Sequence, residues 1–299
     1  MTAATSQPGI APLHAVTKAR DIVFSPPVRA MDATGHTRAV LMDRARGSVH
    51  IGYDLCKLAP GGRIERRVAA YETAVYVTEG ALDLWRDGKE MLLVADDFAL
   101  IPTGTPWALR NSGKAPATWV DVMAPQPKAP GGWVDTFKLG PAAWSKAPPA
   151  RLDPTDPCAR HAAHFNGQMP ASFHVHGDLN GFAIRMLMDK EFGAVHQHMF
   201  VIEFADGGLC NHHDHPFEEA YLLLSGKVDI TFDGKDYVLG PGDFAWTAVG
   251  SRHAFFPKKG QGVRWLEIQA PQPPIREWIR WHERWEAFGK RNSEHSVNS

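Results

Sequence analysis

A histidine-rich segment at residues 207–226 carries side chains that could bind a metal ion. Its sequence is GGLCNHHDHPFEEAYLLLSG. If the segment is a β-strand, His213, His215 and Glu219 can face one side, because side chains alternate in direction with a period of two. His253 follows a tight turn further along the chain and offers a fourth donor. Three neutral imidazoles and one carboxylate suit a divalent transition metal such as Mn, Fe, Co, Ni, Cu or Zn.

Apolar residues near the four donors could line a small-molecule pocket. Alternation puts Tyr221 on the face of Glu219, where its hydroxyl could act in catalysis. An apolar lining with few polar points is typical of small-molecule sites. The same alternation on this and the following strands gives the candidate substrate contacts, which are Leu223, Phe244, Trp246 and Phe255.

The chain contains an internal repeat with a spacing of 146 residues. The triplet DGK at 87–89 recurs at 233–235, and APQP at 124–127 recurs at 270–273, without a gap. Short apolar segments alternate with turns rich in Gly and Pro, the first of them expected at 60–62, which is typical of β-sandwiches and barrels. The sequence therefore predicts two copies of one β-rich unit.

Only the second copy carries the four donors. The equivalent residues of the first copy are Arg67, Ala69, Thr73 and Trp107. We therefore expect the first copy to be metal-free, with a structural role or a role in shaping the neighbouring pocket. Arg67 would stand where a metal ligand normally points, either paired with Glu65 or exposed to solvent.

His198 is peculiar to the second copy, because its counterpart in the first copy is Gly52. It could serve as a proton-transfer group near the metal. The alternative is a hydrogen-bonded histidine of the core. The neighbouring His196 matches His50 and is expected to belong to the scaffold. His198 and Tyr221 are thus the candidate catalytic residues.

The spacing of these residues resembles the paired signature of the cupins. The motif G-x5-H-x-H-x3-E-x6-G fits residues 207–226 without a gap. The second motif, G-x5-P-x-G-x2-H-x3-N, fits residues 242–257 except at Ala248 and Pro257, and neither departure touches a donor. The resemblance implies an all-β chain with two tandem double-stranded β-helix barrels of the jelly-roll-like cupin type.

The repeat and the resemblance together give the expected domain organisation. We expect an N-terminal tail over 1–35 that lies along the first barrel, and a barrel without metal ligands over 36–127. An irregular connector rich in Pro and Gly follows over 128–172, and then the metal-binding barrel over 173–273. An amphipathic helix and tail over 274–299 complete the chain.

Composition argues against several classes of partner. The net charge of −1 gives no electrostatic case for binding nucleic acid or an anionic membrane. We expect neither a signal peptide nor a membrane span, because residues 1–12 lack a basic segment followed by an apolar core and no run of about 18 apolar residues occurs. Three widely spaced cysteines without a CxxC motif favour a reducing, cytoplasmic location. We expect a small-molecule substrate and, by analogy with other cupins, a homodimer.

The resemblance implies a metal-dependent enzyme but leaves its reaction open. The donor set resembles that of cupin dioxygenases, oxalate-degrading enzymes and several isomerases. The layout resembles that of the bicupins related to ureidoglycine aminohydrolase, which use Glu, His, His and Gln as ligands, so their substrate does not carry over. The leading hypothesis is a dioxygenase-type oxidoreductase with one Fe(II) or Mn(II) ion and a small chelating substrate. The alternatives are a non-redox Mn(II)-dependent aminohydrolase, lyase or isomerase, and a non-catalytic binding protein.

Overall fold

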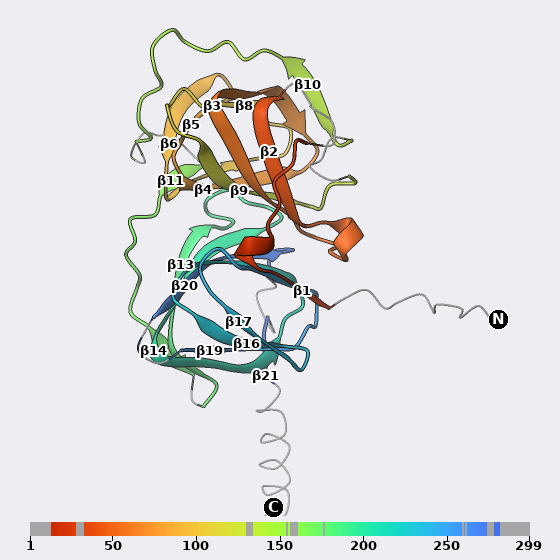
Figure 1. The fold of residues 1–299 in the computed structure, drawn as a ribbon, viewed down its shortest axis with the longest axis vertical. Coiled ribbons are helices and arrows are strands. Elements are labelled where there is room, and N and C mark those ends of the chain that lie inside the picture. The colour runs from red at the N-terminus through yellow and green to blue at the C-terminus, as the bar shows by residue number, and fades with distance from the viewer. Residues whose placement is uncertain are drawn as a thin grey trace, which may run out of the picture.

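The protein forms two curled antiparallel sheets, one above the other in Figure 1. A computed structural model describes residues 13–27, 33–129, 134–153, 155, 161–175, 177–258, 260, 262–273 and 278–281. Within these ranges the only helical segments are two short 3₁₀ turns, Ala19–Asp21 and Arg44–Arg46. No helix of the described chain is long and apolar enough to cross a membrane. The predicted all-β class with two tandem barrels is confirmed.

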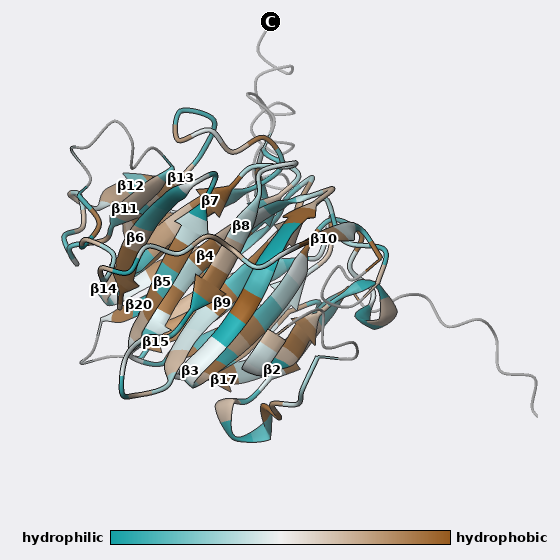
Figure 2. Ribbon diagram, turned by 90° about the horizontal axis from the view of Figure 1, so that it is seen from above, coloured by the Kyte–Doolittle hydropathy of each residue, from teal (hydrophilic) through white to brown (hydrophobic). Residues whose placement is uncertain are grey.

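The N-terminal sheet contains ten strands. They are β2 (Ala33–Met42), β3 (Gly52–Ala69), β4 (Glu72–Glu79), β5 (Ala81–Arg86), β6 (Lys89–Val94), β7 (Asp97–Ile101), β8 (Trp107–Arg110), β9 (Ala117–Ala124), β10 (Thr136–Gly140) and β11 (Ala162–His164). Their order is β11-β7-β4-β9-β3-β8-β5-β6, with β2 and β10 also paired to β3. Figure 2 shows hydrophobic and hydrophilic residues mixed along strands such as β9 and β3, and β9 is buried on both faces.

The turn expected at residues 60–62 is wrong. This segment lies inside the long strand β3, and the pairing of β3 with β2 shifts register there. Gly61 has a φ of 73°, which glycine adopts without strain. The glycines therefore form a bulge that bends one continuous strand, instead of a turn that separates two strands.

The C-terminal sheet repeats this arrangement. Its strands are β1 (His14–Thr17), β12 (Phe173–Val175), β13 (Leu179–Met188), β14 (His198–Asp214), β15 (Glu218–Ser225), β16 (Val228–Phe232), β17 (Lys235–Leu239), β18 (Phe244–Thr247), β19 (His253–Pro257), β20 (Val263–Ala270) and β21 (Arg280–Trp281). Their order is β1-β18-β15-β20-β14-β19-β16-β17. The strands β13 and β21 also pair with β14, and β12 pairs with β13.

The predicted C-terminal helix is wrong at Arg280–Trp281, which form β21. These residues pair with the end of β14, where Arg280 also forms an ion pair with Asp214. An extended chain satisfies the main-chain groups of both strands at this edge, which a helix could not do. Residues 278–279 are not helical either, and the rest of the predicted helix and tail, residues 274–277 and 282–299, lies outside the described residues.

Each barrel is extended by the strand that precedes the other barrel. The N-terminal strand β1 pairs with β18 of the second sheet, and β11 of the connector pairs with β7 of the first. The two pairings are equivalent under the 146-residue shift. The expectation that the tail lies along the first barrel is therefore wrong for residues 14–17. The connector, expected to be irregular, contributes β10 and β11 to the first sheet.

Two buried glutamates join the barrels reciprocally. Glu218, at the start of β15, accepts hydrogen bonds of 2.6–3.1 Å from the main-chain N–H groups of residues 49–51. Its counterpart Glu72, at the start of β4, accepts bonds of 2.9–3.0 Å from the N–H groups of residues 195–197. Buried residues of both barrels also form a single hydrophobic core. Each barrel thus fixes a loop of the other through a charge-assisted contact.

The interior of the N-terminal barrel is filled by charged and aromatic side chains. Arg38 on β2 forms an ion pair with the buried Asp54, and its guanidinium lies 3.7 Å from the carboxylate of Asp121. The ring of His36 stacks on Trp119 with 5.6 Å between centroids. Burial, and then two nearby arginines, lower the pKa of His36 to about 3. The ring therefore stays neutral in the folded protein.

We expect Glu218→Gln to lower the free energy of unfolding by about 2–3 kcal/mol, because a neutral amide would replace a buried carboxylate that accepts several bonds. Urea unfolding followed by circular dichroism measures this change. Glu79→Gln is the matched control, since Glu79 is exposed on β4, and its effect should stay within about 0.5 kcal/mol. Equal effects of the two substitutions would contradict a clamp at Glu218.

We also expect His36 to make stability depend on pH. Its folded pKa lies below the unfolded value of 6.5, so only the unfolded chain takes up a proton as the pH falls below 6.5. The free energy of unfolding should therefore fall by about 1.4 kcal/mol per pH unit from this group alone. His36→Phe introduces the residue type found at the equivalent position 182 and should remove that contribution. Urea unfolding of both proteins at pH 7 and pH 5 tests this, and parallel losses would refute it.

Candidate metal centre

The structure brings the three predicted histidine donors together. His213 lies near the end of β14, His215 directly follows that strand, and His253 begins β19. His213 pairs with His253 across the sheet, so their rings meet. All three side chains are buried, and a nitrogen atom of each lies within 4.8 Å of the other two. This spacing is short enough for one ion to contact all three rings.

The Nδ1 atom of each ring is bound by a main-chain carbonyl oxygen. The pairs are His213 with Asn211 at 2.7 Å, His215 with Trp278 at 2.7 Å, and His253 with Ser251 at 2.8 Å. A carbonyl oxygen can only accept, so Nδ1 carries the proton and a neutral ring keeps a lone pair on Nε2. These bonds fix the orientation of the rings and leave all three Nε2 atoms able to bind a metal.

Glu219 brings a carboxylate to the same cluster. Its Oε1 lies 3.4 Å from His215 Nε2, and its Oε2 lies 3.1 Å from His253 Nε2. The Tyr221 hydroxyl donates to Oε2 at 2.5 Å, and the Gln269 amide donates to Oε1 at 2.9 Å. Burial opposes ionisation of Glu219, whereas the hydrogen bond that the Tyr221 hydroxyl donates lowers the pKa of its carboxyl group. Two donated hydrogen bonds suit a charged carboxylate.

The atoms that face one another in this cluster are acceptors. His253 Nε2 is buried and makes no hydrogen bond, although a carboxylate oxygen of Glu219 lies 3.1 Å away. Burial is the main cause that lowers the pKa of both His213 and His215, so these rings resist taking up a proton. A cation between the lone pairs would turn their repulsion into ligation. The residues thus fit a divalent transition metal with three imidazole ligands and one carboxylate ligand.

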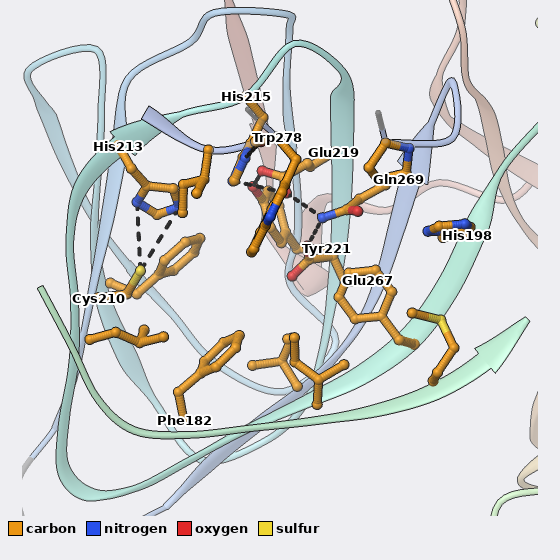
Figure 3. A pocket seen from close by; sticks show the side chains of 18 of the residues that line it. Phe182, His198, Cys210, His213, His215, Glu219, Tyr221, Glu267, Gln269 and Trp278 are labelled. Atoms are coloured by element: carbon orange, nitrogen blue, oxygen red, sulfur yellow. Dashed lines mark hydrogen bonds and ion pairs between the residues drawn. The ribbon is translucent and has the colours of Figure 1, made fainter. Parts of the chain in front are cut away.

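The cluster opens on a cavity of about 670 Å³ inside the second barrel. Its walls are mostly aromatic and aliphatic side chains of β13, β14, β19 and β20. Figure 3 shows His213, His215 and Glu219 gathered at this cavity, with Phe182 across it in this view. A largely apolar chamber with a few polar groups at one place is the usual form of a small-molecule site.

Some of the predicted lining residues do contact this cavity. They are His198, Tyr221 and Phe255. His198 lies beside Gln269 on the neighbouring strand, and Figure 3 shows it on the side away from His213. Burial lowers the pKa of the His198 ring, which favours its neutral form. Tyr221 contacts Glu219 directly, as alternation along β15 predicts.

Three predicted substrate contacts lie elsewhere. Phe244 and Trp246 belong to the core shared by the barrels, where the Trp246 indole N–H donates to Glu218 at 3.4 Å. The reason is register, because Thr247 is the residue opposite Glu219, so Trp246 points to the other face of β18. Leu223 lies in the hydrophobic core of the second barrel and not among the described residues that line the cavity.

Sequence reasoning missed a polar group next to Glu219. Gln269 donates from one amide nitrogen to Glu219 at 2.9 Å and to Glu267 at 3.2 Å, and the Trp265 indole donates to Glu267 at 2.9 Å. Burial, and then the charge of Glu219, raise the pKa of Glu267 well above its usual range. The repeat held a signal for Gln269, because its counterpart in the copy without donors is Met123.

The C-terminal residues 278–281, which include β21, support two of the histidines. Trp281 pairs with His213 in the sheet, and their rings lie 5.0 Å apart. The carbonyl oxygen of Trp278 holds the Nδ1 proton of His215. Sequence analysis could not find this contact, since a carbonyl group belongs to every residue and the segment was expected to be a helix.

The equivalent positions of the first barrel show no donor cluster. Arg67 lies over the ring of Trp107 at 5.6 Å, and its Nε donates to the main-chain carbonyl of Glu65. The carboxylate of Glu65 pairs with Arg63 at 2.6 Å. Throughout the described chain, the three histidines of the second barrel are the only His, Cys, Asp or Glu group close enough to share a metal ion.

Comparisons with known proteins agree with this geometry. A family model for the cupin domain matches residues 54–123 and again 200–269, two ranges that are offset by the repeat spacing. No curated protein sequence matches the chain significantly.

Solved structures of three bicupins are similar to the chain. Salicylate 1,2-dioxygenase from Pseudoaminobacter salicylatoxidans, in its adduct with gentisate, has a TM-score of 0.68 and 13% identity over 88% of this chain and 82% of that one. Oxalate decarboxylase from Bacillus subtilis has a TM-score of 0.66 and 14% identity over 97% and 85%. A protein named as glyoxylate-induced from Pseudomonas aeruginosa has a TM-score of 0.65 and 17% identity over 91% and 95%.

Identities this low support the fold and leave the reaction open. The two matched ranges, the equivalent strand orders and the shared architecture nevertheless agree on one assignment. The chain is a bicupin, a member of the cupin superfamily with two tandem cupin domains.

Proposed function

We propose that the second cupin domain is the active site of a metal-dependent enzyme, an oxidoreductase of dioxygenase type that acts on a small chelating substrate. The observation that carries this proposal is the set of acceptor atoms, three Nε2 atoms and the Glu219 carboxylate, that face one another beside the 670 Å³ cavity. The dioxygenase type is chosen by analogy with salicylate 1,2-dioxygenase, whose fold is similar.

Each residue of the centre has a task in this proposal. His213, His215, His253 and Glu219 would hold Fe(II) or a similar ion. The ion would polarise substrate oxygens and, if it is iron, exchange electrons with dioxygen. Tyr221 and Gln269 fix the carboxylate in its ionised form by donating to its two oxygens. The aromatic walls exclude water, which strengthens every charge interaction at the centre.

A second candidate is a non-redox reaction with Mn(II), of the lyase, isomerase or aminohydrolase type. The observation that favours it is Glu267, a buried acid that lines the same cavity. The Gln269 amide links it to Glu219 by donating a hydrogen bond to each of them. A reaction without dioxygen needs a group that gives or takes a proton, and a buried carboxyl group can do so. His198 is another titratable side chain that lines the cavity.

We expect His213→Ala to lose metal. Removal of a direct ligand should weaken binding by more than the roughly 10–100-fold that changes to outer hydrogen-bond partners produce. Elemental analysis after reconstitution with Fe(II) or Mn(II) should give one ion per chain for the unchanged protein and far less for the variant. His196→Ala is the matched control, because its side chain is not among the described residues that line the cavity. Full metal content in His213→Ala, with the fold intact, would show that His213 is not a metal ligand.

We further expect the Fe(II)-loaded protein to consume oxygen with a chelating aromatic substrate. An oxygen electrode and product analysis should show one O2 consumed per substrate converted, because both atoms of dioxygen enter the product of a dioxygenase. The same assay with His253→Ala should show no uptake. Turnover at an undiminished rate without oxygen would instead support the Mn(II) alternative. Tight ligand binding with no turnover under either condition would refute both enzymatic candidates.

A further inference from the structure

The two barrels can be compared position by position, because their strands share one register. On the strands that line the barrel interiors, the pair Arg38–Cys56 of the first barrel is equivalent to Ile184–Ile202 of the second. In the same way, Asp54–Asp121 of the first barrel is equivalent to Phe200–Glu267 of the second. Any difference in what fills the two interiors therefore comes from side chains at matched places.

The first barrel balances its buried acids with a cation. Asp54 and Asp121 are 1% and 9% exposed, and Arg38 contacts both carboxylates. Buried carboxylates keep their charge when a guanidinium lies beside them. The interior of this barrel is thus occupied by an ion-pair network and carries both signs of charge.

The second barrel keeps the acid and lacks the cation. Ile184 stands where the first barrel has Arg38, and Phe200 stands where it has Asp54. Glu267, at the place of Asp121, is 6% exposed and lines the cavity. The space that the ion pair fills in the first barrel belongs to an open, apolar chamber in the second.

Cationic side chains are scarce around this chamber. Among the described residues that line it, Lys190 is the only lysine or arginine, and its side chain is exposed. Three acidic side chains, Asp189, Glu219 and Glu267, line the same chamber. A ligand carboxylate placed beyond the donor cluster would therefore lose its hydration without gaining an ion pair.

Glu267 and its two hydrogen-bond donors form a polar patch in the wall of the chamber. The two oxygens of Glu267 accept from Trp265 and Gln269, and the surrounding walls carry the rings of Phe182 and Phe255. Aromatic walls favour a flat ligand, because ring contacts add to the burial of apolar area. An uncharged hydroxyl or amide could bond to this polar wall without the cost of burying a charge.

We propose that the cavity selects an uncharged, flat aromatic ligand, with a chelating head at the donor cluster and a hydroxyl or amide beside Glu267, and that it rejects a carboxylate there. This inference rests on the proposed function only in that the donor cluster must hold the chelating head. It names the class of substrate that the site would take. It also gives the position of Ile184 and the side chain of Glu267 a role in specificity.

A matched pair of probes tests the proposal. The probes are 3,4-dihydroxybenzamide and 3,4-dihydroxybenzoate, which share a chelating head and a shape and differ in the charge of the remote group. Titration calorimetry with the full chain loaded with redox-inert Zn(II) measures binding without turnover. We expect the amide to bind at least about 10-fold tighter than the acid, since an uncompensated charge costs more than the roughly 1.4 kcal/mol that corresponds to tenfold. Equal or tighter binding of the acid would overturn the proposal.

A graft from the first barrel tests the cause of the selectivity. Ile184→Arg combined with Glu267→Gln brings in the guanidinium of Arg38 without an acid to neutralise it. This variant should bring the preference for the amide to within about 2-fold or reverse it. The control is Ile184→Met with Glu267→Gln, which carries the same change at residue 267 but no cation at residue 184. It should keep the preference for the amide. A graft that folds and still prefers the amide by tenfold would show that charge is not the cause.

The design separates this inference from the proposed function. If zinc analysis of the unchanged protein shows no bound ion, the metal site fails. If zinc is bound and neither probe binds, the substrate class proposed here fails while the metal site stands. If the graft does not fold by circular dichroism, the comparison of the two probes on the unchanged protein still decides the matter.

Discussion

The strict alternation of side chains at Glu218 and Glu219 is the constraint on which both the assembly and the site depend. Two neighbouring carboxylates begin β15 and must face opposite sides of the sheet. Glu218 reaches the loop at residues 49–51 of the other barrel, while Glu219 reaches His215 and His253. A shift of one residue would exchange the two roles and break both contacts. The contacts of Glu218 with the other barrel therefore also fix the position of Glu219 relative to His215 and His253.

The repeat shows how little of a barrel must change to make a site. The first copy retains the clamp through Glu72 but has Thr73 where the second has Glu219. Arg38 and its acidic partners fill its interior. Burying these charged groups costs free energy, and the attraction between the opposite charges offsets that cost. The second copy dispenses with that network and opens a chamber lined by apolar side chains. Scaffold and chemistry thus occupy different positions of the same strands.

Sequence alone predicted the two barrels and the four candidate donors, because both depend on spacing. The 146-residue repeat gives the architecture, and the cupin-like spacing marks the donors. Alternation along one strand does not explain how they meet, because the chain turns between β14, which carries His213, and β15, which carries Glu219. Trp246 was misplaced since its face depends on its partner in the sheet, Thr247 being the residue that meets Glu219. Periodicity within one strand gives a set of faces, but the pairing between strands decides which face meets the cavity.

Contacts made by main-chain groups were beyond sequence reasoning for a different reason. The carbonyl oxygens of residues 211, 251 and 278 set the protonation of the three imidazoles, yet no side-chain type marks such an oxygen. Two of them belong to the strand or turn that carries the histidine itself, so local geometry supplies them. The third comes from Trp278, in the segment that leads into β21, more than 60 residues beyond His215. Because an Nε2 lone pair on His215 requires a proton held at Nδ1, the C-terminal segment belongs to the candidate metal centre as much as the strand that bears the ligand.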